Sequence, residues 1–423
     1  MSLPARRRAV VTGMGAITPV GNSAAATWSA LVAGCSGLGP VTRFDASPYP
    51  SRVAGEIKGF CPEDFIDAKE ARRMARASQV AIVAAREAVT DSGLDLAHED
   101  RERAGVIMGT GIGCVEMLTE PLFKLRDTGV VRTSPFSALA ALANMPAFHV
   151  GLEQRCLGPM STVVTACASG VQAIGDALEV IRRDTADIML AGGVEAQITP
   201  LFFGGFSALH NLSARNDDPA GASRPFDADR DGLVIGEGVA VLVLEALEHA
   251  QARGARIYAE VLGQATSSDA YHIAQPDPAG DGPVRCMRWA MRDAGVAPEQ
   301  IDYVNAHGTA TRMNDPVETA AIKRVFGSHA YEVPISATKS MTGHCFGGSG
   351  AIETLACVMS VYADTIHPTI NCERPDPDCD LDYVPGVARH QPVYLALNNA
   401  FGFGGQNACL VVSKWKGNST PCA

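Results

Sequence analysis

The sequence predicts an α/β protein made of two halves. Short runs rich in strand-forming residues alternate with segments whose apolar residues recur at helical spacing, a pattern typical of sheets covered by helices. The expected strands are nearly continuous apolar runs, as they are when both faces of a sheet are buried. The chain has 423 residues, of which 47% are hydrophobic and 19% charged. A chain of this length and composition can bury a large core across two to three domain-sized units.

The first half is expected to span residues 1–255. Four apolar residues of one segment recur at helical spacing and share one face of a helix; they are Val171, Ile174, Leu178 and Ile181. The other expected helices are 24–32, 71–89 and 138–152, the last broken near Pro146. The expected strands are 9–12, 105–108, 161–165, 188–191 and 239–244.

The second half is expected to span residues 256–412, followed by a tail at 413–423. Its expected strands are 258–262, 303–306, 335–337, 394–397 and 408–412, and its expected helices are 283–294, 316–325 and 351–361. Because the two halves have a similar order of elements, we expect a duplicated unit, although they share no strong sequence repeat.

Charge and cysteine content narrow the class of protein. The formal net charge is −11, from 35 Lys and Arg against 46 Asp and Glu, with no concentrated basic stripe, so we expect no nucleic-acid partner. The 12 cysteines are scattered and form no Cys-x-x-Cys pair, which indicates reduced thiols in a cytoplasmic protein. No apolar run approaches the ~18–20 residues of a membrane span, and glycine and proline break the apolar stretch after the basic residues 6–8. We therefore expect neither a membrane span nor a signal peptide.

Cys167 is the first candidate for chemistry. It lies where the expected strand 161–165 gives way to the helix, with small residues on both sides that leave room for a substrate carbonyl. A junction of this kind directs the thiol at the positive end of the helix dipole, which favours the thiolate. The alternative is a buried structural cysteine, which is how we interpret most of the other cysteines.

Two histidines follow expected strands of the second half. His307 and His344 both stand in glycine-bearing loops after strands, where catalytic groups of α/β proteins gather. Asp315 and Glu318 lie three residues apart on one face of an expected helix. A third glycine-bearing segment, 398–407, is either a tight turn or an oxyanion site built from backbone N–H groups.

Taken together, these segments resemble the β-ketoacyl-acyl carrier protein synthases, in particular the elongating type II branch of the thiolase superfamily. The resemblance covers nearly the whole chain; its motifs are 10–15, 163–171, 215–219, 223–227, 230–232, 267–272, 303–311, 339–344 and 398–407. It implies a five-layered α-β-α-β-α fold from two related halves, usually a homodimer. It also implies extension of an acyl chain by two carbons, with no metal and no organic cofactor.

The resemblance implies roles for the candidate residues. Cys167 matches the acylated nucleophile, His307 and His344 match the paired histidines, and Lys339 matches the lysine that organises them. Transfer of an acyl group to a thiol needs N–H donors for the tetrahedral oxyanion. Decarboxylation of a malonyl thioester then places negative charge on its carbonyl oxygen, which two neutral imidazole N–H donors can stabilise.

Further implied roles concern the surroundings of these groups. Asp315 and Glu318 match acidic residues that support the histidines and the lysine. Phe403 matches the aromatic residue whose backbone N–H joins that of Cys167 in the oxyanion hole and whose side chain gates the pocket. The implied partner is the acyl carrier protein, loaded with an acyl or a malonyl group.

The chain departs from the family pattern after His344, where residues 345–350 read Cys-Phe-Gly-Gly-Ser-Gly in place of the usual Leu-Leu-Gly-Ala-Ala-Gly. Phe346 is therefore placed to reshape the pocket near the histidines. We expect fatty-acid elongation, with a specialised type II polyketide or polyene pathway as the alternative and a heterodimer with a chain-length partner as the alternative to a homodimer. A non-catalytic chain-length subunit is the alternative of another class, but such subunits lack the nucleophile that this chain has at Cys167.

The nearest alternative is a chain-initiating synthase or a degradative thiolase, and a nucleotide-binding enzyme is a more distant one. Chain-initiating synthases and thiolases share the fold, but the presence of both His307 and His344 argues against each. The glycine segments 13–15 and 109–113 suggest a nucleotide-binding enzyme as an alternative. Neither segment, however, completes a Gly-x-Gly-x-x-Gly motif at the start of a helix.

A basic patch for the carrier protein is also expected. Carrier proteins of this family's pathways are typically acidic, so a net-negative synthase needs local positive charge to hold one. Lys69, Arg72 and Arg73 cluster at the start of an expected helix and are the candidates. The alternative is an ordinary solvated helix face.

Overall fold

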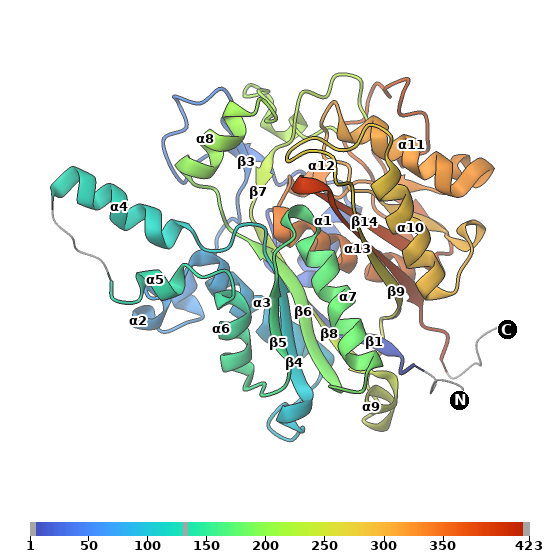
Figure 1. Cartoon of the computed structure of the whole chain (residues 1–423), viewed down its shortest axis with the longest axis horizontal. Helices are drawn as coiled ribbons and strands as arrows, with labels where there is room; N and C mark the ends of the chain where they lie inside the picture. Colours follow the sequence, from blue (N-terminus) through green and yellow to red (C-terminus); the bar gives the residue numbers. More distant parts are fainter. Residues whose placement is uncertain (1–5, 130–133, 418–423) are drawn as a thin grey trace.

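The computed structural model describes residues 6–129 and 134–417 (Figure 1). Its centre is a ten-stranded sheet with the strand order β11-β10-β14-β15-β9-β1-β8-β6-β4-β5. The strands from the first half of the chain are β1 (Ala9–Ile17), β4 (Ala104–Gly109), β5 (Met160–Val163), β6 (Ile188–Glu195) and β8 (Gly238–Ala246). Those from the second half are β9 (Ala259–Ser268), β10 (Tyr303–Asn305), β11 (Ile335–Ser336), β14 (Leu395–Gly402) and β15 (Gln406–Lys414).

The two halves of this sheet have the same topology. In the first half, β1 pairs antiparallel with β8, β8 pairs antiparallel with β6, and β6 and β5 each pair parallel with β4. In the second half, β9 pairs antiparallel with β15, β15 pairs antiparallel with β14, and β14 and β11 each pair parallel with β10. The halves meet where residues 9–11 of β1 pair with residues 259–261 of β9. This repeat in space supports the duplicated unit that the order of elements predicts.

Helices form three layers around the two halves of the sheet. α7 (Ser169–Arg182) and α13 (Ser349–Ala363) lie in the middle, where their apolar residues share one core with strands of both halves. α3 (Arg76–Ser92) and α6 (Met145–Gln154) cover the outer face of the first half. The outer face of the second half is covered by α10 (Asp281–Ala294) and α11 (Asn314–Phe326). Figure 1 shows α6 to the left and α10 and α11 to the right of the central strands, and the arrangement is the five-layered α-β-α-β-α fold that the resemblance implied.

β8 shows why the strands appear in the sequence as nearly continuous runs of apolar residues. Its alternate residues Val239, Val241 and Val243 pack in the outer core with α3, whereas the residues between them, Ala240, Leu242 and Leu244, pack in the middle core with α7 and α13. Every residue of β8 is buried. Both faces of the strand therefore contribute apolar burial, at about 1.5–3 kcal/mol for each large side chain.

β1 is longer than the expected strand 9–12, because its glycines are not a turn. A Cβ on Gly13 would lie 2.2 Å from the carbonyl oxygen of Ala88, and one on Gly15 would lie 2.0 Å from that of Ala84. Both carbonyls belong to α3, so the glycines let this helix pack directly on the strand. The glycine segment 13–15 therefore lies inside a strand and does not open a nucleotide-binding helix.

Two expected helices are each divided. In place of the expected helix 71–89, the chain forms the short α2 (Ala68–Ala71), a turn, and then α3. Gly93 caps the C-terminal end of α3 in the left-handed conformation. The expected helix 138–152 is α5 (Ser137–Ala140) and α6, which has Pro146 in its first turn, where proline is tolerated. β15 continues to Lys414, so the first residues of the expected tail belong to a strand; residues 418–423 lie outside the described residues.

The remaining elements are short or peripheral. The helices are α1 (Ala24–Val32), α4 (Glu116–Thr128), α8 (Pro200–Ala208), α9 (Leu247–Ala252) and α12 (Lys339–Thr342). The strands are β2 (Gly39–Pro40), β3 (Val53–Gly55), β7 (Ile235–Gly236), β12 (Thr365–Ile366) and β13 (Arg389–His390). α4 was not expected from the sequence; it buries none of its residues and projects from the body at the left of Figure 1. Among the residues described, no helix has both the length and the apolar character needed to cross a bilayer.

Candidate active site

Cys167 stands on a sharp turn between β5 and α7. The turn is the 3-10 segment Ala166–Ala168, in which Ala166 has the left-handed φ of +50°. Ser169 holds the turn: its Oγ accepts a hydrogen bond from the N–H of Thr165 at 2.8 Å and lies 2.7 Å from the carbonyl oxygen of Ala166. This geometry places the thiol at the N-terminal end of α7, where only 2% of the Cys167 surface is exposed.

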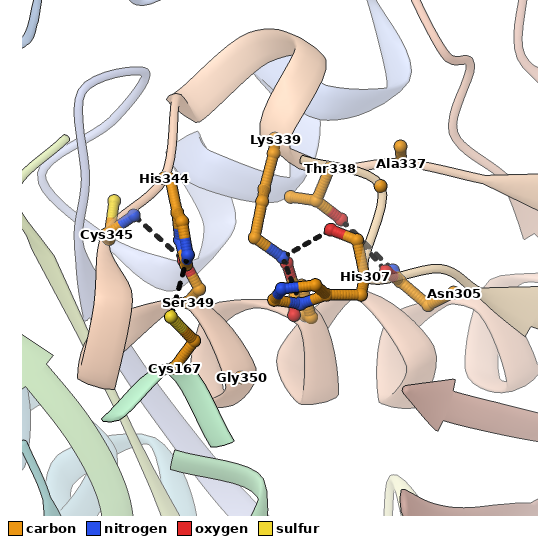
Figure 2. A network of polar contacts seen from close by, with 12 residues as sticks. Cys167, Asn305, His307, Ala337, Thr338, Lys339, His344, Cys345, Ser349 and Gly350 are labelled. Atoms are coloured by element: carbon orange, nitrogen blue, oxygen red, sulfur yellow. Dashed lines mark hydrogen bonds and ion pairs between the residues drawn. The ribbon is translucent and has the colours of Figure 1, made fainter. Parts of the chain in front are cut away.

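The second half of the chain builds the same turn at the corresponding place. Between β11 and α13 lies the 3-10 segment Phe346–Gly348, in which Phe346 has a φ of +41°. Ser349 takes the position of Ser169, because its Oγ accepts a hydrogen bond from the N–H of Cys345 at 2.8 Å. The duplicated fold therefore places the thiol at one turn and His344 beside the other, and these two turns face each other at the middle of the molecule (Figure 2).

His344 points its Nε2 at the sulfur of Cys167, at a distance of 3.0 Å. Its Nδ1 lies 3.2 Å from the backbone N of Phe346. The same nitrogen lies 3.1 Å from Oγ of Ser349, which Figure 2 shows beside the ring. A backbone N–H can only donate, so Nδ1 accepts and the proton of the neutral ring is on Nε2. The hydrogen-bond partners thus assign His344 as an N–H donor directed at the sulfur.

His307 is held from two sides at the end of β10. The carboxylate of Glu318 on α11 accepts hydrogen bonds from the backbone N–H groups of His307, at 2.8 Å, and Gly308, at 2.9 Å. Lys339 Nζ donates to the carbonyl oxygen of His307 at 2.7 Å and lies 3.3 Å from its Nδ1 (Figure 2). An ammonium group can only donate, so the ring proton of His307 is also on Nε2. Lys339 is in turn paired with Glu353 at 2.5 Å.

The three central groups converge in space. Sγ of Cys167 and one ring nitrogen each of His307 and His344 lie within 4.8 Å of one another. The two imidazole rings are nearly perpendicular, at 84°, with centroids 5.5 Å apart. Such a Cys-His-His set could also ligate a metal ion, but Lys339 places positive charge 3.3 Å from His307 Nδ1 and so opposes a cation.

The electrostatics of these groups follow from their burial. Burial lowers the pKa of His307 and of His344 well below the usual value, and the charge of Lys339 lowers both further, so both imidazoles are neutral at physiological pH. Burial raises the pKa of Cys167 to about 12, although the N–H groups of Phe403 and Cys167 and the charge of Lys339 oppose this shift. The loss of hydration on burial is the largest cause of this shift, and it opposes the preference for the thiolate that the helix end provides.

The remaining sequence candidates take different places. Phe403 begins a 3-10 turn after β14, and a hydrogen bond from its backbone N–H lowers the pKa of the Cys167 thiol. Asp315 does not touch the histidines. Its carboxylate accepts from the N–H of Phe226 at 2.9 Å and lies 3.7 Å from the guanidinium of Arg230, so it supports the neighbouring loop. Of the two acids, Glu318 alone contacts the backbone of His307 among the described residues.

Two buried carboxylates that contact the site or its supporting turns were missed by the sequence reasoning. Glu353 is the only charged residue in α13, and an isolated acid in an otherwise apolar helix was the signal that could have found it. Glu195, at the end of β6, accepts from the N–H of Gly111 at 2.6 Å and from that of Gly347 at 3.2 Å. It thereby ties the turn after His344 to the loop after β4. Because this carboxylate already occupies the N–H of Gly111, the glycine segment 109–113 is not a free phosphate cradle.

A cavity of about 630 Å³ leads to these groups. Cys167, His307 and His344 lie among its lining residues, and exposed residues such as Met313 line it as well. Phe401, Phe403 and glycines 402, 404 and 405 form another part of the lining. The cavity can therefore admit a substrate to the sulfur and to both imidazoles at once.

Most of the other cysteines have the packing roles expected of them. All eleven cysteines within the described residues are unpaired thiols, and nine of these are buried, Cys167 among them. Cys345, although next to His344 in sequence, is fully buried, and its sulfur lies 3.9 Å from the carbonyl oxygen of Thr342.

Comparison with known families and relatives gives a consistent result. The family description "Beta-ketoacyl synthase, N-terminal domain" matches residues 6–250, and "Beta-ketoacyl synthase, C-terminal domain" matches residues 258–373. Proteins named 3-oxoacyl-[acyl-carrier-protein] synthase 2 are similar over nearly the whole chain. The one from Synechocystis sp. is 49% identical and the one from Coxiella burnetii is 46% identical, and each match covers 97% of this chain and 99% of the relative.

Solved structures give the same picture. The ishigamide ketosynthase/chain length factor superposes with a TM-score of 0.91 at 38% identity. A ketosynthase of a type II polyketide system, solved with its acyl-carrier protein and bound to the hexaketide, superposes with a TM-score of 0.91 at 35% identity. Each match covers 97% of this chain and 100% of the other.

Proposed function

Because the chain belongs to the β-ketoacyl synthase family, we propose that Cys167, His307 and His344 perform the condensation for which its relatives are named. The chain is a 3-oxoacyl-[acyl-carrier-protein] synthase, an acyltransferase that joins a malonyl group to an acyl chain in fatty-acid elongation. The observation that carries the assignment of residues is that both imidazoles are fixed as Nε2–H donors beside one thiol.

The first step is transfer of the acyl group to Cys167. The sulfur attacks the thioester carbonyl of the loaded carrier protein, the carbon–sulfur bond to the carrier breaks, and the thiol proton ends on the carrier's sulfur. The Nε2–H of His344, 3.0 Å from the sulfur, stabilises the charge that develops there. The backbone N–H groups of Cys167 and Phe403 are placed to donate to the tetrahedral oxyanion, a contribution of about 10²–10³ in rate for one donor.

The second step is decarboxylation of the malonyl thioester in the cavity. The bond to the carboxylate breaks, carbon dioxide leaves, and the electron pair passes into an enolate whose oxygen carries the charge. The Nε2–H groups of His307 and His344 donate to that oxygen without taking up a proton. Since Lys339 and the Phe346 N–H fix the opposite nitrogens, the donors need no reorganisation during the reaction.

The third step forms the new carbon–carbon bond. The enolate carbon attacks the carbonyl of the acyl-cysteine, and the sulfur of Cys167 leaves and takes up one proton from solvent. The product is a 3-oxoacyl group, longer by two carbons, on the carrier protein. Holding both thioesters in one water-poor cavity supplies the entropic part of the rate enhancement.

Two measurements test these assignments. Intact-mass analysis after incubation with acyl-carrier protein should show one acyl adduct, and an adduct that persists in Cys167→Ala would refute Cys167 as the nucleophile. Release of carbon dioxide from malonyl-carrier protein should fall by at least about 10²-fold in His307→Ala and in His344→Ala. Wild-type rates in both variants would mean that the histidines are wrongly assigned.

Acyl carrier protein is the partner of this chain, and we propose that it docks on α2. Lys69 is exposed on this short helix, and Arg72 is exposed directly after its last residue. Arg73 is held by Glu70 at 2.8 Å and lies over the ring of Phe136 at 4.8 Å. Lys69 and Arg72 are therefore the charges best placed to reach an acidic partner.

We further propose that two copies of the chain pair through β5, the edge strand of the sheet. Met160 on this strand is 43% exposed, and it is surrounded by other exposed apolar residues, namely Phe148, Leu152 and Leu157. An exposed edge strand with an apolar surround is a surface that a second chain covers. Sedimentation velocity should give a dimer, and a monomer at micromolar concentration would refute this; a heterodimer with a chain-length partner is the alternative occupant of the same face.

A further inference from the structure

The thiol of Cys167 faces two different surroundings. On one side is the cavity already described, through which the malonyl thioester must reach His307 and His344. On the other side, Cys167 belongs to an apolar cluster with Phe346, against which Phe202 and Phe206 pack. While the malonyl group occupies the cavity, this apolar side is the part of the surroundings of Cys167 that suits an acyl chain. This reasoning rests on the proposed function.

Three phenylalanine rings fill the apolar side. The ring centroids of Phe202 and Phe346 are 4.9 Å apart, those of Phe206 and Phe346 are 5.0 Å apart, and those of Phe202 and Phe206 are 4.8 Å apart. Aromatic rings in direct contact have centroids about 4.5–7 Å apart, so each of these rings touches the other two. We call Phe202, Phe206 and Phe346 the aromatic wall; a long acyl chain cannot pass it unless a ring moves.

Phe346 is the fixed part of the aromatic wall. Its ring stacks on that of His344, with centroids 4.5 Å apart and an angle of 18° between the planes. Its backbone N–H donates to Nδ1 of the same histidine, and its φ of +41° belongs to the turn that precedes α13. Displacing Phe346 would therefore disturb the imidazole that the reaction needs.

Phe202 is the residue of the aromatic wall whose ring can move. It lies on α8, is only half-buried, and is followed by Gly204 and Gly205. A Cβ on Gly205 would meet nothing within 4 Å, so this part of the helix has free space beside it. The neighbouring Phe203 points elsewhere, because it packs on Phe44 and Tyr49 with centroids 5.5 Å and 6.0 Å away.

We propose that the aromatic wall makes this enzyme selective for short acyl chains. A chain of a few carbons fits on the sulfur before it reaches the rings, whereas a longer one has to displace Phe202 against packed neighbours. Forcing extra methylene groups into a packed interior disfavours the loaded state by roughly one to two powers of ten. Butanoyl groups should accordingly load onto Cys167 at least about tenfold faster than dodecanoyl groups.

The experiment compares acylation of Cys167 by butanoyl-, octanoyl- and dodecanoyl-carrier protein, followed by intact-mass analysis at early times. Phe202→Ala should raise the dodecanoyl rate by about tenfold and leave the butanoyl rate within a factor of about three. Phe346→Leu, whose ring also stacks on His344, should raise the ratio of the dodecanoyl rate to the butanoyl rate. Phe203→Leu is the matched control, because it shortens the adjacent ring outside the wall and should leave the ratio of the two rates unchanged. Thermal unfolding of each variant checks that it is folded.

The outcomes are distinct. A wild-type enzyme that loads dodecanoyl as fast as butanoyl overturns the selectivity, as do folded Phe346→Leu and Phe202→Ala variants whose rate ratio equals that of wild type. In both cases an adduct on Cys167 still forms and the proposed function stands. If no donor of any length acylates Cys167, the proposed function fails and the selectivity fails with it.

Discussion

Lys339 forms a buried ion pair with Glu353, and variants of this pair can separate the structural role of Lys339 from its chemical role. Both side chains are 1% exposed, and burial already raises the pKa of Glu353. In Glu353→Leu the ammonium of Lys339 stays buried without its carboxylate. Loss of one member of a buried pair costs about 3–5 kcal/mol, so the free energy of unfolding should fall by about that amount.

The double variant Lys339→Met/Glu353→Leu removes both charges and fills their space with apolar side chains. Replacement of a whole buried pair is often neutral, so stability should return to within about 2 kcal/mol of wild type. Decarboxylation should not return, because the ammonium that contacts Nδ1 of His307 and holds its Nε2–H tautomer is gone.

Unfolding in urea, followed by circular dichroism, and release of carbon dioxide from malonyl-carrier protein measure the two effects independently. Full decarboxylation by a stable double variant would show that Lys339 does not set the tautomer of His307. A double variant as unstable as Glu353→Leu would show that the ion pair is not the source of the lost stability.

Four further changes test other parts of the structure. Because the pKa of Cys167 is raised to about 12, its alkylation by iodoacetamide should still accelerate above pH 9; a plateau by pH 8 would contradict a neutral resting thiol. The pKa of Glu195 is raised from 4.5 to about 7, so its contribution to stability is complete below pH 4.5 and is lost as the pH rises through 7. Glu195→Gln should reduce that loss by about 3 kcal/mol, measured as urea unfolding at pH 5 and pH 8, and an unchanged pH dependence would count against the burial of this acid. Gly13→Ala, whose methyl would lie 2.2 Å from the Ala88 carbonyl, should destabilise the protein by more than about 2 kcal/mol, and a neutral effect on thermal unfolding would refute close packing of β1 on α3. Lys69→Glu should weaken the apparent affinity for carrier protein at low salt by several-fold, whereas Arg288→Glu on α10, on the other side of the molecule, should not; equal effects of the two would remove α2 as the docking surface.

The fold was predictable where local pattern and burial agree. The spacing of Val171, Ile174, Leu178 and Ile181 gave α7 correctly, because all four side chains pack in the middle core. The length of β1 was not predictable, since glycines usually mark turns, and only the close approach of α3 shows that Gly13 and Gly15 continue the strand. α4 was missed although Leu118, Leu122 and Leu125 recur at helical spacing, and none of these side chains is buried in the structure.

The site was predictable in its residues but not in its electrostatics. Sequence reasoning selected Cys167, His307 and His344, and the structure brings them within 4.8 Å of one another. It identified the helix end as a cause that favours the thiolate, but not the burial that raises the pKa of Cys167. Burial depends on the whole fold, so no local motif could have revealed it. Glu353 could have been noticed as an isolated acid in an apolar helix, but its pairing with Lys339 could not, because the two residues become neighbours only in the folded chain.

The two left-handed turns before α7 and α13 have different roles in the two halves of the chain. Strained turns of this type at Ala166 and Phe346 are each costly to form, by about 1–3 kcal/mol, yet one thiol is enough for the chemistry. The turn at Phe346, which carries no thiol nucleophile, can therefore have a different role. In this chain it carries an aromatic side chain that contacts both the acyl side of the pocket and the imidazole of His344. A residue at position 346 therefore affects both the length of the acyl chain that the enzyme accepts and the alignment of the His344 imidazole. A substitution there cannot alter one of these properties without the other.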